Sequence, residues 1–144
     1  MTAKPPAPRP CASCPYRRDV PSGVWTEHEY AKLPNYDEPT WSQPVGLFLC
    51  HQRDRDDDRV SVCSGWAGCH DGDHLMAVRI ALSTGEITVE TATAICAYDS
   101  PVPLFGSGAE AATHGMRDID NPGPAAIEMM DKIRRSRTDL IEKE

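Results

Sequence analysis

The chain has 144 residues, with 13 prolines, six cysteines and a formal net charge of −7. This length suits one domain with a single core and argues against two independent domains. The negative charge argues against a free-standing nucleic-acid-binding protein, because phosphate contacts require clustered Lys and Arg. Since only two phenylalanines are present, the core is poor in large side chains and an additional cross-link is expected.

The six cysteines could supply that cross-link as disulfides or as metal ligands. Residues 1–10 contain no apolar signal-peptide core, and the longest apolar runs, such as residues 45–50, are too short to span a membrane. We therefore expect a cytoplasmic protein without a membrane segment. In a reducing compartment, cysteines bind metals more often than they form disulfides.

The first half of the chain is expected to be rich in loops. Residues 1–10 contain four prolines and predict a flexible, extended arm. Thr26 and Glu29 form a capping box that predicts a short helix ending before Pro34. The apolar residues 45–49 predict either a short strand or a buried turn.

Three helices are predicted in the second half. Apolar spacing favours a helix over residues 74–82, which Gly85 closes. Residues 88–98 also favour a helix, on which Cys96 is expected to be a buried, inert thiol. A capping box that begins at Ser107 predicts a third helix ending at Gly115.

A last amphipathic helix is predicted to begin near residues 122–124. The fold class is therefore mainly α: a small, loop-rich, metal-stapled single domain, with minor β structure possible near residues 45–50. We divide the chain into a flexible arm (1–10), a cysteine-rich metal-binding domain (11–120) and a C-terminal amphipathic helix (121–144). This helix is expected to bury its apolar face, which comprises Ile127, Met130, Ile133, Leu140 and Ile141.

A metal centre is the main functional prediction. Cys11 and Cys14 form a CxxC motif, which places two sulfurs on one tight turn that can bind a single metal or cluster. Cys50 and Cys63 are the natural second pair, because they flank a polar loop that can return the chain to the same point. Three further residues stay open as alternative ligands: Cys69, His51 and His70.

Other side chains near these cysteines are expected to surround the metal ligands. Tyr16 and Trp66 are predicted to shield the centre from water, and Arg17 to donate a hydrogen bond to a thiolate sulfur. Such hydrogen bonds reduce the cost of burying several negative charges.

Two resemblances bear on the ligands. The CxxCP motif followed by two separated cysteines is similar to the [4Fe-4S] loop of family 4 uracil-DNA glycosylases, but only locally, since the catalytic motifs of that family are absent. The WhiB-like regulators, which bind [4Fe-4S], are similar in the spacing of Cys63 and Cys69. Their order of motifs differs, because the CxxC comes first here.

A broader resemblance covers roughly residues 9–115. The segments CASCPYRRDVPSGVW, LFLCHQ, CSGW and SPVPLFGSGAEAATHG resemble a family of uncharacterised small proteins of actinobacteria and their phages. The resemblance implies that the recurring cysteines of the CxxCPxR, CH and CxGW motifs are the ligands, and it implies no activity. The ligand set is then Cys11, Cys14, Cys50 and Cys63.

The identity of the metal is predicted less firmly than the ligands. Zn²⁺ is the common metal for four cysteines in a small cytosolic domain. A proline directly after Cys14 and the wide spacing of Cys50 and Cys63 favour a [4Fe-4S] cluster by a narrow margin.

The favoured function is a non-enzymatic accessory or regulatory protein that acts through a protein partner. The apolar segment of residues 100–108 is expected to contribute to the partner-binding surface. The alternative is a redox or catalytic protein with an open metal site, in which Cys69, His70 or Asp71 is the reactive group. No motif in the sequence names a reaction.

A third hypothesis is a nucleic-acid-binding regulator. It would use Arg9, Arg17 and Arg18 together with the basic residues near the C-terminus. These residues would have to lie on one face of an otherwise acidic protein.

Overall fold

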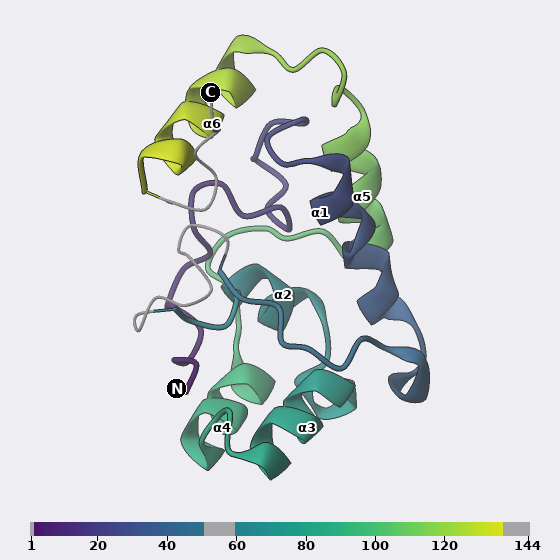
Figure 1. Cartoon of the computed structure of the whole chain (residues 1–144), viewed down its shortest axis with the longest axis vertical. Coiled ribbons are helices and arrows are strands. Elements are labelled where there is room, and N and C mark those ends of the chain that lie inside the picture. Colours follow the sequence, from purple (N-terminus) through teal and green to yellow (C-terminus); the bar gives the residue numbers. More distant parts are fainter. Residues whose placement is uncertain (1, 51–59, 137–144) are drawn as a thin grey trace, which may run out of the picture.

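Short helices joined by long loops make up the part of the chain that the computed structural model describes, residues 2–50 and 60–136 (Figure 1). Helices α3 (Met76–Thr84) and α4 (Val89–Ala97) form one end of the molecule, and α6 (Pro124–Ser136) lies at the other. Helix α2 (Ser64–Cys69) lies between them. Within the described residues, the only β pairing consists of isolated bridges, so the predicted mainly helical, single-domain fold is confirmed.

The first capping box forms as predicted. Helix α1 (Glu27–Ala31) begins after Thr26, whose side chain accepts a hydrogen bond from the backbone N–H of Glu29 at 3.4 Å. The chain then continues in two 3-10 helices, η1 (Leu33–Asp37) and η2 (Thr40–Ser42). The first α-helix therefore ends before Pro34, where the sequence places its end.

Helices α3 and α4 also follow their predicted signals. Gly85 ends α3 with a φ of +79°, a left-handed conformation that glycine adopts without strain. Thr88 caps α4 by accepting a hydrogen bond from Thr91 N–H at 3.1 Å. The 3-10 helix η3 (Gly72–His74) joins α2 to this pair and packs against α4.

Helix α5 (Gly108–Met116) begins as predicted but ends later. Ser107 accepts a hydrogen bond from the backbone of Glu110 at 3.1 Å. The prediction that Gly115 ends this helix is wrong, because Gly115 lies within it, buried against the ring of Tyr30 on α1. A glycine is needed here because it allows two helices to approach closely, not because the backbone turns.

The apolar run at residues 45–49 is neither a regular strand nor wholly buried. Leu47 and Phe48 are buried, whereas Val45 is 66% exposed. Leu49 forms one antiparallel bridge with Val62. The β structure expected near residues 45–50 is thus reduced to a single bridge.

The proline-rich N-terminal segment makes hydrogen bonds to distant parts of the chain. Lys4 forms a parallel bridge with Ser61, and the Ser64 hydroxyl donates to the carbonyl of Ala7 at 2.7 Å. The Tyr98 hydroxyl donates to a carbonyl in the same segment, at Pro8. Residues 2–10 therefore run along the surface of the domain.

Helix α6 packs its apolar face beside the CxxC turn. Ala126 and Ile133 are buried, and Met129 and Ile133 line a cavity together with Ala12 and Ser13 of that turn. The predicted burial of Ile127 is wrong, since this side chain is 48% exposed. Met130 is half-buried, and the predicted face continues into Leu140 and Ile141, which lie outside the described residues.

None of the described helices is long and apolar enough to cross a bilayer.

The close approach of α1 and α5 gives a first prediction. In Gly115→Ala, the added methyl group would overlap the Tyr30 ring, so the free energy of unfolding should fall by about 2 kcal/mol. Urea denaturation followed by circular dichroism measures this change. Gly46→Ala is the matched control, because a Cβ at Gly46 meets nothing within 4 Å; equal effects of the two substitutions would contradict the packing described.

Candidate metal centre

The CxxC motif forms a tight turn, as predicted. The N–H of Cys14 donates to the carbonyl of Cys11 at 3.0 Å, and the N–H of Arg17 donates to the carbonyl of Cys14 at 3.1 Å. The indole N–H of Trp25 donates to the carbonyl of Ser13 at 2.9 Å. Since these donors and acceptors are all buried or partly buried, the turn is fixed from both sides.

The other two cysteines are neighbours because of the bridge between Leu49 and Val62. Two backbone hydrogen bonds flank this bridge, from Cys50 N–H to Ser61 and from Cys63 N–H to Phe48, both at 2.9 Å. Cys50 and Cys63, which flank the polar segment of the sequence, are therefore held beside one another. This is the arrangement that the sequence predicts for the second pair.

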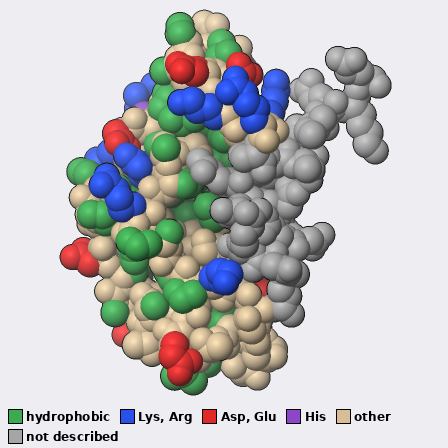
Figure 2. All heavy atoms as spheres, turned by 90° about the vertical axis from the view of Figure 1, so that its left-hand side faces the viewer, with side chains coloured by type: hydrophobic (Ala, Val, Ile, Leu, Met, Phe, Trp, Pro, Cys, Tyr) green, Lys and Arg blue, Asp and Glu red, His purple; other side chains and the backbone are tan. Residues whose placement is uncertain are grey.

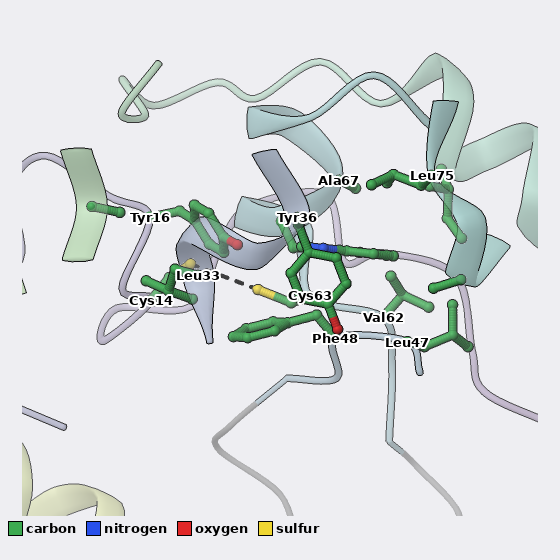
Figure 3. Packing of buried hydrophobic residues seen from close by; sticks show 14 of the residues in the cluster. Cys14, Tyr16, Leu33, Tyr36, Leu47, Phe48, Val62, Cys63, Ala67 and Leu75 are labelled. Atoms are coloured by element: carbon green, nitrogen blue, oxygen red, sulfur yellow. Dashed lines mark hydrogen bonds between the residues drawn. The ribbon is translucent and has the colours of Figure 1, made fainter. Parts of the chain in front are cut away.

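The two pairs meet in the core. The Sγ atoms of Cys14 and Cys63 lie 3.8 Å apart, among buried aromatic and aliphatic residues (Figure 3). Cys11 lies near enough to Cys14 and Cys50 for both thiols to shift its pKa. The structure thus brings the four predicted ligands near one another, and we call this set the four-thiol group.

The geometry of the four-thiol group is close to that of a metal site without matching it fully. Among residues 2–50 and 60–136, no three His, Cys, Asp or Glu side chains already form an arrangement that would hold a metal ion. The thiol contacts nevertheless place Cys11 and Cys50 next to the close pair. Binding one ion therefore requires these two side chains to move toward Cys14 and Cys63.

Electrostatics disfavour four thiolates without a cation. Contact with Cys14 raises the pKa of Cys11 to about 12, with burial adding to the effect and Cys50 opposing it. For Cys14, contact with Cys11 lowers the pKa, but contact with Cys63 and burial outweigh it, so that the pKa lies well above its usual range. Thiols of this kind lose their protons when a metal ion supplies the compensating charge.

Two features of the surrounding backbone suit a thiolate at Cys14. The backbone N–H of Tyr16 donates to the Cys14 sulfur and favours its charged form. Gly65 of the CSGW motif lies against the same sulfur, and a Cβ at this position would overlap it. Sequence reasoning did not single out Gly65, although a glycine two residues after Cys63 is the available signal.

The residues predicted to surround the centre divide into two groups. Tyr16 and Trp66 are both 0% exposed, and Tyr16 lies beside the close thiol pair (Figure 3). Arg17 differs from the prediction: its side-chain hydrogen bonds go to Asp19, at 2.8 and 2.7 Å, and to the carbonyl of Pro10. It therefore braces the turn instead of donating to a sulfur.

Trp66 also carries an unsatisfied donor. Its Nε1 is buried without a hydrogen-bond partner among the described residues. Trp66 lies three residues after Cys63 on helix α2. An orphaned buried N–H is costly, so this donor destabilises the described fold unless an acceptor reaches it.

The alternative ligands Cys69 and His70 both line a separate cavity, and His70 also contacts Tyr16. His70 Nε2 lies 3.3 Å from the Tyr16 hydroxyl, and Nδ1 lies 3.7 Å from an oxygen of Asp37. Burial lowers the pKa of His70, with Asp37 opposing it. Both alternatives line a cavity of about 500 Å³ together with Asp71, and His51 lies outside the described residues.

The remaining cysteines, Cys69 and Cys96, do not have the environment of a reactive, nucleophilic thiol. Burial, and then the charges of Asp37 and Glu110, raise the pKa of Cys69 to about 12, so this thiol is protonated at neutral pH. Cys96 is exposed on α4, which corrects the expectation that it is buried. The six cysteines are all free thiols.

The donor set can be tested against each candidate metal. For a tetrahedral Zn²⁺ with zinc–sulfur bonds of about 2.3 Å, neighbouring sulfurs lie about 3.8 Å apart. The separation of 3.8 Å between Cys14 and Cys63 equals this value. In a [4Fe-4S] cluster each thiolate binds a different iron, so the sulfurs must stand farther apart. The spacing of this one pair is closer to that of a single tetrahedral ion than to that of a cluster.

Comparisons with known proteins place the chain in a family. Residues 6–137 match the model of a family of unknown function, DUF6283, and the chain belongs to that family. The matched range contains all four cysteines of the four-thiol group and helix α6. Neither the search of the curated proteins nor that of the solved structures found a match.

The raised pKa of Cys69 predicts a stability change at high pH. The folded state keeps the Cys69 proton up to about pH 12, whereas the unfolded state loses it near the usual thiol pKa. The contribution of the Cys69 proton to the free energy of unfolding is therefore complete below about pH 8.5. It is lost as the pH rises toward 12, with a slope of about 1 kcal/mol per pH unit.

Urea denaturation of metal-free protein between pH 8 and 11 tests this dependence. Cys69→Ala should show the shallower loss of stability, whereas Cys96→Ala should follow the wild type. Parallel curves for the wild type and Cys69→Ala would contradict a buried, protonated thiol at this position.

Proposed function

We propose that this chain is a small metal-thiolate protein in which Cys11, Cys14, Cys50 and Cys63 hold one metal ion. The observation that carries the proposal is the convergence of the CxxC turn with the Leu49–Val62 bridge, which leaves two sulfurs 3.8 Å apart. The ion would join two segments that are distant in sequence, and its binding free energy would add to folding stability.

Zinc is the metal that these residues favour. The sulfur separation supports a tetrahedral ion over a [4Fe-4S] cluster, against the narrow preference drawn from the sequence. When bound, Zn²⁺ supplies positive charge and four directed bonds, without redox chemistry of its own. The raised pKa values of Cys11 and Cys14 suggest that binding releases protons, so affinity should increase with pH. A reducing cytoplasm would keep these thiols available.

A non-enzymatic role is supported by the state of the residues in the second cavity. The Cys69 thiol is protonated at neutral pH because its pKa is about 12. His70, its neighbour in sequence, makes its short contact to the Tyr16 hydroxyl. A nucleophilic cysteine needs a lowered pKa and an adjacent base, and the environment of Cys69 has the opposite effect.

Nucleic-acid binding receives less support than a structural role. Arg17 is held by Asp19, and Arg18 donates to the Leu104 carbonyl at 2.8 Å and lies over the ring of Phe105. On the face in Figure 2, the Lys and Arg side chains stand in separate groups among hydrophobic and polar atoms. Phosphate binding would favour a continuous basic stripe.

A protein partner is the remaining part of the proposal. The segment expected to bind it, residues 100–108, is partly occupied within the chain, since Leu104 bridges Arg17 and the Phe105 N–H donates to Tyr16. Trp41 is a better candidate, because it is 80% exposed on η2. Tryptophan is among the residues that contribute most to protein interfaces.

The metal proposal is tested by elemental analysis of purified protein. We expect one zinc per chain in the wild type and almost none in Cys14→Ser, because the substitution removes a ligand from the close pair. Gly65→Ala should also reduce the zinc content severely, since its methyl group displaces the Cys14 sulfur.

Cys96→Ser provides the matched control, because Cys96 is exposed and is not one of the four proposed ligands. It should retain one zinc per chain and wild-type stability. A wild-type protein that binds no metal after purification under reducing conditions with added zinc, or a Cys14→Ser variant that binds it fully, would refute the proposed centre.

The partner hypothesis predicts a specific effect of Trp41→Ala. Because the side chain is exposed, the substitution should leave the free energy of unfolding within about 0.5 kcal/mol of the wild type. It should reduce the recovery of a bound partner about tenfold or more. Quantitative mass spectrometry of proteins captured from the native host by the two folded chains measures the difference; identical recovery would exclude Trp41 from the interface.

A further inference from the structure

We infer that Cys14 and Cys63 form a site of oxidative modification, at which a peroxide converts the two thiols into a disulfide and thereby releases the metal. The inference rests on the proposed metal centre, because release requires that both residues be ligands. The oxidation itself requires only the two thiols and their neighbours.

The geometry of the pair supports bond formation. The two Sγ atoms are 3.8 Å apart and face one another across the contact between the CxxC turn and the start of helix α2 (Figure 3). A disulfide bond is about 2.05 Å long, so the sulfurs must approach by a little under 2 Å. The CxxC turn is a loop, and rotation of the Cys14 side chain can supply part of this movement.

The two thiols are poorly accessible, so an oxidant must reach them through a neighbour. Cys14 is 1% exposed and Cys63 is 4% exposed. Cys11 is more exposed than either, and its thiol contacts Cys14. Of these three thiols, Cys11 is therefore the one that a small oxidant reaches most easily.

The chemistry can be written as three balanced steps. The Cys11 sulfur, which would be a thiolate while a bound metal compensates its charge, attacks hydrogen peroxide. The O–O bond breaks, Cys11 becomes a sulfenic acid, and the departing hydroxide takes up a proton from solvent and leaves as water. Cys14 attacks that sulfur, which forms a Cys11–Cys14 disulfide and releases the second water. Cys63 then attacks the Cys14 sulfur, which forms the Cys14–Cys63 disulfide and returns Cys11 as a thiol, with the Cys63 proton transferred to it. In sum, two thiols lose two electrons and two protons, and one peroxide becomes two waters.

Formation of this disulfide would remove half of the ligands at once. Only Cys11 and Cys50 would remain as thiolates, and two ligands do not hold a structural zinc, which requires four. The metal would leave, while the disulfide would keep the CxxC turn attached to helix α2. Oxidation would thus exchange one cross-link for another between the same two segments.

The test uses the full chain with Cys69→Ser and Cys96→Ser, so that only the four proposed ligands remain as thiols. Zinc content is measured first, and this result alone decides the metal proposal. Hydrogen peroxide is then added, zinc release is followed with a chromogenic chelator, and disulfides are mapped by mass spectrometry of quenched samples.

We expect loss of two thiols per chain and a cross-link between Cys14 and Cys63 as the main product. Zinc should be released at the rate at which the two thiols are lost. An early Cys11–Cys14 cross-link should decay as the final product accumulates. A final product that joins Cys11 to Cys14 or to Cys50, oxidation to sulfinic acid without cross-linking, or zinc release that precedes any disulfide would overturn the inference. Formation of the cross-link in a chain that binds no zinc would refute the metal centre and the release step together, and it would leave the pair as an oxidation site alone.

Discussion

The contact between the Cys14 and Cys63 sulfurs is the point on which the arrangement of the chain depends. It joins the CxxC turn to the start of helix α2, and it lies beside the bridge between Leu49 and Val62. Three segments distant in sequence therefore meet within a few ångströms. The N-terminal segment, through Lys4, adds a fourth by pairing with Ser61. Without this contact, the described loops around it would have no regular sheet and no long helix to hold them together.

The proposed metal would explain why such a contact can be stable. Aromatic rings and alanines make up about half of the buried hydrophobic residues in the described part of the chain. Ordering long loops costs conformational entropy that a small core offsets poorly. The raised pKa values of Cys11 and Cys14 indicate that burying thiolates alone would be unfavourable. A bound cation would reverse that cost and add direct bonds between the segments.

Local signals in the sequence predicted local structure well. The caps at Thr26 and Ser107 depend on residues only three positions apart, and each forms as expected. The role of Gly115 was missed because its partner, the ring of Tyr30, is remote in the sequence. The role of Arg17 was missed because Asp19, two residues later, accepts its hydrogen bonds in place of a sulfur. The predicted burial of Cys96 and Ile127 was also wrong. The sequence places each residue on an apolar helical face, but it does not say which part of that face packs against the domain. The four cysteines lie near one another because their spacing and a tight turn limit where their sulfurs can lie; their role as metal ligands stays a prediction.

X-ray absorption spectroscopy at the metal edge tests the central claim most directly. The account predicts a zinc edge with a single shell of four sulfurs at about 2.3 Å, and the same shell in the variant that lacks Cys69 and Cys96. An iron edge with short iron–iron scattering would contradict the tetrahedral site and indicate a cluster. A zinc shell dominated by nitrogen or oxygen would show that the metal is held elsewhere, and that the four thiols do not form the centre of this fold.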